Sequence, residues 1–202
     1  MSLDSDRRQQ ERRFQQAGQP PPGQSLTLKW PVLHEGQIPP FDQARWDFQV
    51  RGLVKNPLRL SWEEFQKLPQ VRVRAGFHCV TAWSKMDNEW GGVPFRVVAE
   101  MAAPLPEAQY VMVHAEQGYT TNLPLADLMC DTVLFATSHA PEPLTPEHGA
   151  PLRLVVPHLY AWKSAKWVRG LVFTDVDQPG YWERVGYHMY GDPFREQRYR
   201  GQ

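Results

Sequence analysis

The sequence predicts a mixed α+β domain, rich in sheet, with helices as minor and peripheral pieces. Three observations support this class. Several short apolar runs have strand character, and only two segments carry clear helix signals. The chain also holds 19 prolines in 202 residues, roughly twice the usual share of about 5%. Prolines at this density favour irregular connections between short elements and argue against a helical bundle.

Alternation of apolar and polar residues predicts the strands. Trp46, Phe48 and Val50 alternate with polar neighbours, which indicates a half-buried strand ending at Gly52. A second strand is expected from Val71 toward Cys79. Further strand-like runs cover residues 110–113, 133–137, 152–156 and 168–176.

Two short helices are predicted from their start and stop signals. Ser61 is followed three residues later by Glu64, the spacing of a capping box, and Pro69 ends the helix after residue 68. The second helix is expected over residues 95–101, after the turn signal of residues 91–94.

Composition divides the chain into a tail, residues 1–24, and one domain, residues 25–202. The tail is polar and ends in three consecutive prolines, so we expect it to be disordered or loosely packed. The 22 basic and 22 acidic residues balance, which argues against a nucleic-acid-binding protein. No apolar run approaches the ~20 residues of a membrane span, and no export signal follows Arg12 and Arg13. We therefore expect a cytoplasmic protein.

Several common catalytic motifs are absent from the sequence. It has no CxxC or HxxxH pair for zinc, no glycine-rich phosphate loop and no GxSxG. Cys79 and Cys130 are the two cysteines, too few to indicate a disulfide framework. Cys79 on its own fits either a thiol nucleophile or a buried structural residue.

Three segments together resemble the molybdopterin-binding domain of the sulfite oxidase family. They are GFHCVTAWSKMDNEWGGVPF at 76–95, HGAPLRLVVP at 148–157 and KSAKWVRGLVF at 163–173, and residues 46–69 are similar to the strand and helix that precede the cysteine. The order and spacing match the family from about residue 29 to residue 190. The resemblance implies the sheet-rich fold of that domain and an oxidoreductase of the single-domain bacterial type.

The resemblance also implies a molybdenum cofactor and the residues that hold it. Cys79 stands at the position of the metal ligand, and a soft thiolate suits a metal already bound by the sulfurs of the pterin cofactor. Arg153 and Lys166 match the positions that face the cofactor phosphate. Cys130 has no counterpart as a ligand and is assigned to packing. The implied cofactor contacts are, in chain order, His34, Cys79, Gln117, His148, Arg153, Ser164, Ala165 and Lys166.

Departures from the family pattern inform the substrate. Sulfite oxidases place arginines shortly after the metal cysteine, whereas residues 80–84 here contain none. Thr137 falls where those enzymes have a tyrosine, so the expected substrate pocket consists of Trp83, Ser84 and Thr137. Such a pocket favours a small neutral sulfur or nitrogen oxide over sulfite. The resemblance to single-domain bacterial members implies a separate electron-transfer protein, and we expect a monomer. The alternatives are a non-catalytic molybdopterin-binding or carrier module, and a thiol enzyme that uses Cys79 without metal.

Overall fold

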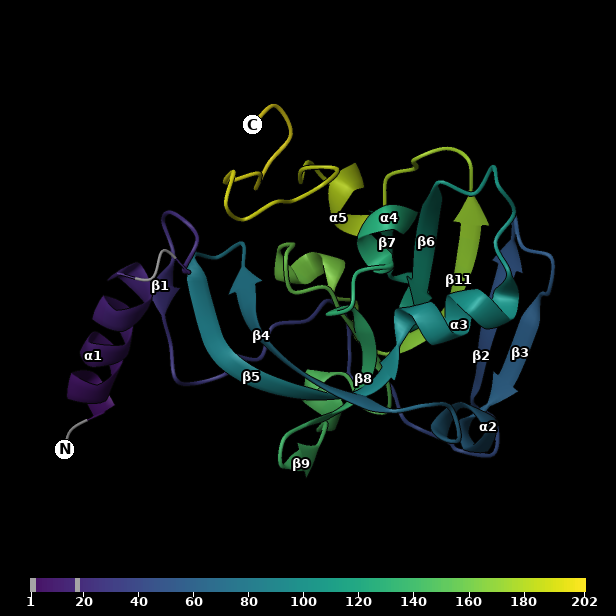
Figure 1. Cartoon of the computed structure of the whole chain (residues 1–202), viewed down its shortest axis with the longest axis horizontal. Helices are drawn as coiled ribbons and strands as arrows, with labels where there is room; N and C mark the ends of the chain where they lie inside the picture. The colour runs from purple at the N-terminus through teal and green to yellow at the C-terminus, as the bar shows by residue number, and fades with distance from the viewer. Residues whose placement is uncertain (1–2, 17–18) are drawn as a thin grey trace.

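The computed structural model describes residues 3–16 and 19–202, in which two mixed sheets form the body of the molecule (Figure 1). The six-stranded sheet runs β1-β5-β8-β10, with β4 paired to β5 and β9 paired to β8. The five-stranded sheet has the order β3-β2-β11-β6-β7. The predicted sheet-rich α+β class is confirmed.

The strands of the six-stranded sheet are β1 (Ser25–Leu26), β4 (Val71–Cys79), β5 (Trp83–Pro94), β8 (Leu134–His139), β9 (Glu142–Pro143) and β10 (Arg153–Val155). Those of the five-stranded sheet are β2 (Asp47–Gly52), β3 (Leu58–Ser61), β6 (Tyr110–Ala115), β7 (Thr120–Pro124) and β11 (Val168–Thr174). The α-helices are α1 (Leu3–Gln16), α2 (Trp62–Gln66), α3 (Phe95–Ala102), α4 (Leu125–Leu128) and α5 (Tyr181–Arg184). Three short 3₁₀ turns are η1 (Glu116–Gly118), η2 (Pro146–His148) and η3 (Ala161–Lys163).

The main core lies between the two sheets and includes α2 and α3. Phe48 and Val50 on β2 are fully buried there, as their alternation predicts, and they share the core with Phe95 of α3 and Phe135 of β8. Burying side chains of this size stabilises the fold by about 1.5–3 kcal/mol each. The core packs the five-stranded sheet against β8, β10 and the end of β5, whereas Phe77 and Trp90 of the β4–β5 hairpin belong to a second, smaller cluster.

The capping box predicted at Ser61 is present. The Ser61 hydroxyl accepts from the Glu64 amide at 3.3 Å, and the Glu64 carboxylate accepts from the Ser61 amide at 2.8 Å. This contact lowers the pKa of Glu64, because the hydrogen bonds favour its charged form. The helix α2 then ends at Gln66, within the predicted segment.

The amino-terminal tail contains more secondary structure than its composition predicts. Residues 3–16 form α1, with Asp4 and Asp6 in the first turn and Arg13 in the last, an arrangement that complements the helix dipole. Phe14 is 5% exposed and anchors the helix near β1. The helix α1 differs from a fully disordered tail, while a loosely packed tail and the domain boundary at residue 24 stay predictions. No helix in the described part of the chain is long and apolar enough to cross a bilayer.

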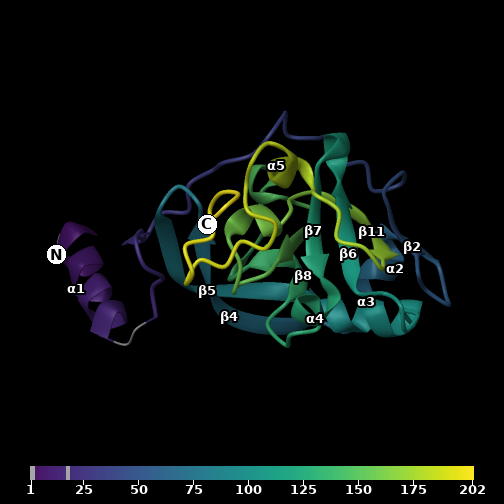
Figure 2. The same cartoon turned by 90° about the horizontal axis from the view of Figure 1, so that it is seen from above.

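The candidate active site depends on the hairpin β4–β5 and on the carboxy-terminal segment, residues 185–202. This segment follows α5 and passes over the end of the hairpin (Figures 1 and 2). Its Arg198 donates from Nε to the carbonyl of Val80 at 3.3 Å, in the turn that joins β4 to β5. The fold therefore brings residues near 190 back to residues near 80.

Candidate active site

A cavity of about 510 Å³ opens between the end of the β4–β5 hairpin, residues 30–36 and residues 161–167. This volume lies in the range of about 300–1,000 Å³ that is usual for sites of small molecules and cofactors. Most of the residues predicted from the sequence meet here. The predicted residues that line it are His34, Cys79, Trp83, Gln117, Arg153, Ser164, Ala165 and Lys166.

Cys79 is the last residue of β4 and is 7% exposed. Its Sγ lies 3.1 Å from the Thr81 hydroxyl, and its carbonyl accepts a hydrogen bond from the Gln24 side chain at 3.1 Å. The neighbouring His78 does not line the cavity and instead places Nδ1 2.8 Å from the Ser84 hydroxyl. Burial lowers the pKa of His78 to about 4, so its ring is neutral at pH 7. The two residues have different surroundings because successive side chains of a strand point to opposite faces.

Arg153 is a buried cation without an acidic partner. One guanidinium nitrogen donates to the His148 carbonyl at 2.9 Å and another to the Ser164 carbonyl at 3.1 Å, while Nε has no partner. Burial lowers the pKa of Arg153 to about 9. Its guanidinium packs over the rings of Trp30, Phe77 and Trp90, with Cζ at 5.4 Å, 5.0 Å and 5.6 Å from their centroids, but no carboxylate among the described residues neutralises it. A buried cation without a counter-ion fits a site that receives an anion.

Lys166 is a second cation at the same cavity. Its Nζ donates to the carbonyls of Leu33 at 2.7 Å and Glu147 at 2.6 Å. Burial, together with the charge of Arg153, lowers the pKa of Lys166 to about 7. Within the described part of the chain, neither Lys166 nor Arg153 takes part in an ion pair. Two unpaired cations facing one cavity are the donor set that a phosphate group requires.

His34 and Gln117 line the cavity from loops. The His34 ring packs edge-on against Trp167, with 5.4 Å between ring centroids. Gln117 has a left-handed backbone, with φ of 56°, and its side-chain amide donates to the carbonyl of Gln37 at 2.6 Å and accepts from the Gln37 amide at 3.1 Å. Gln117 therefore connects η1 to the segment that forms one edge of the cavity.

Three predicted residues do not line the cavity. Ser84 is fully buried beside His78, because it follows Trp83 on β5 and points to the other face of the strand. Thr137 lies on β8 and places its hydroxyl 3.5 Å from the Gly91 carbonyl. His148 stacks on Trp30, with 3.9 Å between ring centroids, and its carbonyl accepts from Arg153. His148 therefore supports the wall, because Trp30 itself lines the cavity.

Cys130 is exposed, so its assignment to packing is wrong. It follows the short helix α4, and its Sγ lies 3.9 Å from the Ala126 carbonyl. The site of Cys130 is thus a surface turn rather than the core.

Sequence reasoning missed an aromatic wall. Several aromatic residues that were not predicted line the cavity, and five of them form one continuous series of ring contacts: Tyr119, Trp162, Tyr181, Trp182 and Tyr187. Their centroids follow one another at 5.7 Å (Tyr119–Tyr181), 5.2 Å (Tyr181–Trp182), 4.9 Å (Trp182–Tyr187) and 5.1 Å (Tyr187–Trp162). The high tryptophan content and the closely spaced aromatic residues after residue 180 were the available signals.

The sequence profile of the oxidoreductase molybdopterin binding domain matches residues 35–182. The uncharacterized oxidoreductase YuiH of Bacillus subtilis is 52% identical over 189 residues, which cover 93% of this chain and 96% of YuiH. The protein-methionine-sulfoxide reductase catalytic subunit MsrP of Campylobacter jejuni is 30% identical over 168 residues, 75% of this chain and 56% of MsrP.

Among solved structures, the sulfane dehydrogenase SoxCD from Paracoccus pantotrophus shares the fold. Its TM-score is 0.64 at 24% sequence identity, over 74% of this chain and 42% of that one. The predicted resemblance to the sulfite oxidase family is confirmed. The chain therefore belongs to the family of molybdopterin-binding oxidoreductases, and its cofactor is the molybdenum cofactor.

Proposed function

We propose that the protein is a molybdenum-cofactor oxidoreductase that transfers an oxygen atom from a small neutral sulfur or nitrogen oxide, with a sulfoxide as the best fit. One observation carries the proposal. The thiol of Cys79, the unpaired cations Arg153 and Lys166, and the aromatic wall all face one cavity. One site thus combines a metal ligand, two cations that can bind an anion, and an uncharged surface for the substrate.

The residues of the cavity fit the cofactor. Cys79 would ligate molybdenum, Arg153 and Lys166 would hold the phosphate, and Ser164 and Ala165 would contact it through their backbone. The Arg153 Nε that lacks a partner supports this assignment. When bound, the cofactor supplies a centre that exchanges an oxygen atom and two electrons.

The chemistry of the walls favours a neutral substrate. Trp83, Trp162, Trp182 and Tyr187 offer flat apolar faces. Among the described residues, only Arg153 and Lys166 bring a lysine or arginine side chain to the cavity. The reaction is sulfoxide + 2 electrons + 2 protons → sulfide + water. A separate electron-donor protein would supply the electrons. The Campylobacter relative supports this proposal, since its name states a methionine sulfoxide substrate.

The first experiment measures the cofactor and both directions of reaction. Protein from a host that makes the molybdenum cofactor is expected to contain molybdenum and to yield the fluorescent oxidised pterin. With reduced viologen as donor it should reduce methyl phenyl sulfoxide, whereas sulfite oxidation should be slower. Two arginines that bind sulfite in sulfite oxidases are absent here, and each charge-assisted bond contributes roughly 1.5–3 kcal/mol. Sulfite oxidation should therefore be slower than in those enzymes by about two to four orders of magnitude.

The alternatives give different results in the same experiment. A carrier module would contain the cofactor and turn over neither compound, and a thiol enzyme would contain no molybdenum. Sulfite oxidation faster than sulfoxide reduction would contradict the substrate assignment.

The variant Lys166→Met tests the proposed binding of the cofactor phosphate by Arg153 and Lys166. The variant keeps the aliphatic stem and removes the charge, so the phosphate loses a partner at a cost on the order of 2–5 kcal/mol for a desolvated pair. Pterin content per protein is expected to fall at least about tenfold, with the fold retained by circular dichroism. Lys55→Met is the matched control, because Lys55 is exposed. Parental pterin content in Lys166→Met would show that Lys166 does not bind the cofactor phosphate.

A further inference from the structure

Tyr187 lines the same cavity as Cys79, although the two residues lie far apart in the sequence. The carboxy-terminal segment brings them together, because its Arg198 bonds the carbonyl of Val80, the residue after Cys79. Tyr187 itself pairs with Tyr199, the residue after Arg198, in an antiparallel β-bridge. Tyr187 therefore faces the end of the cavity where Cys79 lies.

The ring of Tyr187 is held by aromatic neighbours on several sides. It stacks on Trp182 with 4.9 Å between centroids and 24° between planes. Trp162 and Tyr199 contact it edge-on, at 5.1 Å and 5.5 Å. The amide of Tyr187 donates to the Trp182 carbonyl at 3.0 Å. The position of the hydroxyl is thus set before any ligand binds.

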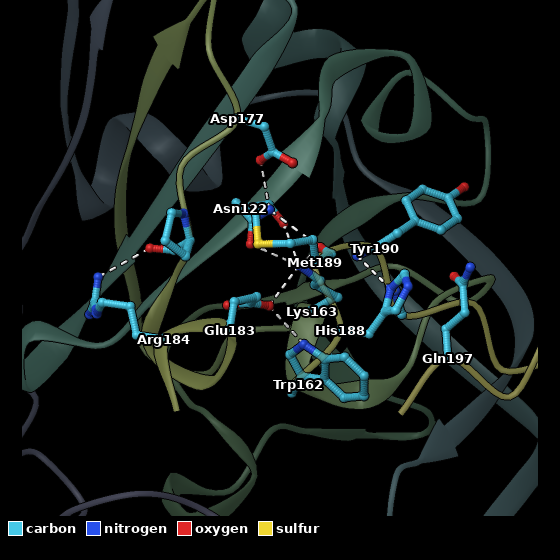
Figure 3. Close-up of polar contacts among 12 residues, drawn as sticks. Asn122, Trp162, Lys163, Asp177, Glu183, Arg184, His188, Met189, Tyr190 and Gln197 are labelled. Atoms are coloured by element: carbon cyan, nitrogen blue, oxygen red, sulfur yellow. Dashed lines mark hydrogen bonds and ion pairs between the residues drawn. The ribbon is translucent and has the colours of Figure 1, made fainter. Parts of the chain in front are cut away.

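The chain on both sides of Tyr187 is also fixed, by Lys163 (Figure 3). The Lys163 ammonium lies 2.6 Å from the Glu183 carboxylate and donates to the Met189 carbonyl at 2.6 Å. Two further bonds, each of 2.9 Å, join it to the carbonyl and the side chain of Asn122. Lys163 and Glu183 are 1% and 0% exposed. One buried ammonium therefore ties residues 183 and 189 to β7 and leaves Tyr187 between them.

The Tyr187 hydroxyl makes no hydrogen bond with any described residue, whereas the hydroxyls of Tyr119 and Tyr190 are paired. The hydroxyl of Tyr119 donates to the Trp162 carbonyl at 2.6 Å, and that of Tyr190 donates to Asp127 at 3.0 Å. Burial raises the pKa of Tyr187, so the phenol keeps its proton and acts as a donor at neutral pH. A donor that faces a filled cavity needs a partner, because burying it unpaired costs about 1–3 kcal/mol.

We propose that the Tyr187 hydroxyl binds the oxygen atom of the substrate and holds it at the Cys79 end of the cavity. The inference rests on the proposed function. As the sulfur–oxygen bond breaks, two electrons enter from the donor and two solvent protons convert the oxygen to water. Tyr187 keeps its own proton and donates a hydrogen bond to the oxygen as negative charge develops on it. The uncharged aromatic wall accommodates the rest of the substrate.

The test compares Tyr187→Phe with the control Tyr199→Phe. The control removes the hydroxyl of Tyr199, whose ring contacts that of Tyr187 edge-on. Tyr199 is 49% exposed and does not line the cavity. Cofactor-loaded oxidised protein binds methyl phenyl sulfoxide without turnover when no reductant is added, so its affinity can be measured by calorimetry. In Tyr187→Phe, affinity for the sulfoxide should weaken about three- to tenfold, while affinity for methyl phenyl sulfide should not change. With viologen, kcat/KM should fall on the order of 100-fold.

The outcomes separate the two proposals. A parent protein that reduces the sulfoxide, with Tyr187→Phe equal to it in both affinity and kcat/KM, would overturn the role of Tyr187 alone. Equal loss of sulfide and sulfoxide affinity, or a fall in pterin content, would also overturn it, because the ring or the cofactor would then be responsible. A cofactor-loaded parent without activity would refute the proposed function and this inference together.

Discussion

Cys79→Ser is expected to abolish sulfoxide reduction while the protein stays folded. A serine hydroxyl is a hard and weakly acidic ligand, whereas molybdenum held by dithiolene sulfurs favours a soft thiolate. The change in volume is small, and the carbonyl of residue 79 would keep its bond from Gln24. Arg153 and Lys166 remain to hold the phosphate, so much of the pterin should be retained. Activity with reduced viologen, pterin fluorescence and the melting temperature measure these three effects separately.

Cys130→Ser is the matched control. Its side chain is exposed on a surface turn, and Cys130 does not line the cavity. This variant should keep parental activity and parental cofactor content. Similar activity in the two serine variants would contradict the assignment of Cys79 as the metal ligand.

Lys163→Met should produce the largest loss of stability. It leaves the Glu183 carboxylate buried without its cationic partner, and breaking a buried pair in this way costs about 3–5 kcal/mol. Burial lowers the pKa of Lys163 even though Glu183 raises it, which shows how strongly desolvation acts at this site. The free energy of unfolding from urea titration measures the effect. A melting temperature lower by about 2–4 °C per kcal/mol should accompany it.

Two further variants test the cause of this loss. The double variant Lys163→Met with Glu183→Gln removes the uncompensated charge and should recover part of the stability. Arg72→Met breaks an ion pair in which the Arg72 side chain is 80% exposed, and such a pair contributes only about 0–1 kcal/mol. A loss in Lys163→Met no larger than in Arg72→Met would show that the buried pair contributes little net stability.

Local signals were sufficient for much of the fold. The alternation at Trp46, Phe48 and Val50 corresponds to β2, and the Ser61–Glu64 capping box starts α2. These predictions succeed because strand alternation and helix capping depend on neighbouring residues alone. The composition of residues 1–24 did not indicate α1, which is supported by the buried Phe14 and by the i,i+4 pair of Arg7 with Glu11.

The position of Thr137 in the candidate site could not be predicted from neighbouring residues alone. Thr137 was placed in the pocket by counting along the chain, but β8 pairs Ala136 with Gly92 and Ser138 with Gly91, so Thr137 lies at an irregularity of the ladder. A side chain added to Gly92 would collide with the Phe135 carbonyl, so this close pairing requires glycine. Register of this kind is set by the partner strand and cannot be read from one segment.

The sequence by itself determined the fold class, the family and most of the predicted residues that line the cavity, because Cys79, Arg153 and residues 164–166 lie in motifs that are contiguous in the chain. Only the tertiary structure decided which faces of β5 and β8 reach the cavity. It also decided that Tyr187 lines the same cavity as Cys79. The carboxy-terminal segment reaches the hairpin through single long-range contacts, such as Arg198 with Val80 and Lys163 with Met189. Contacts between residues so distant leave no periodic pattern in the sequence, since they depend on how the completed sheets place their loops.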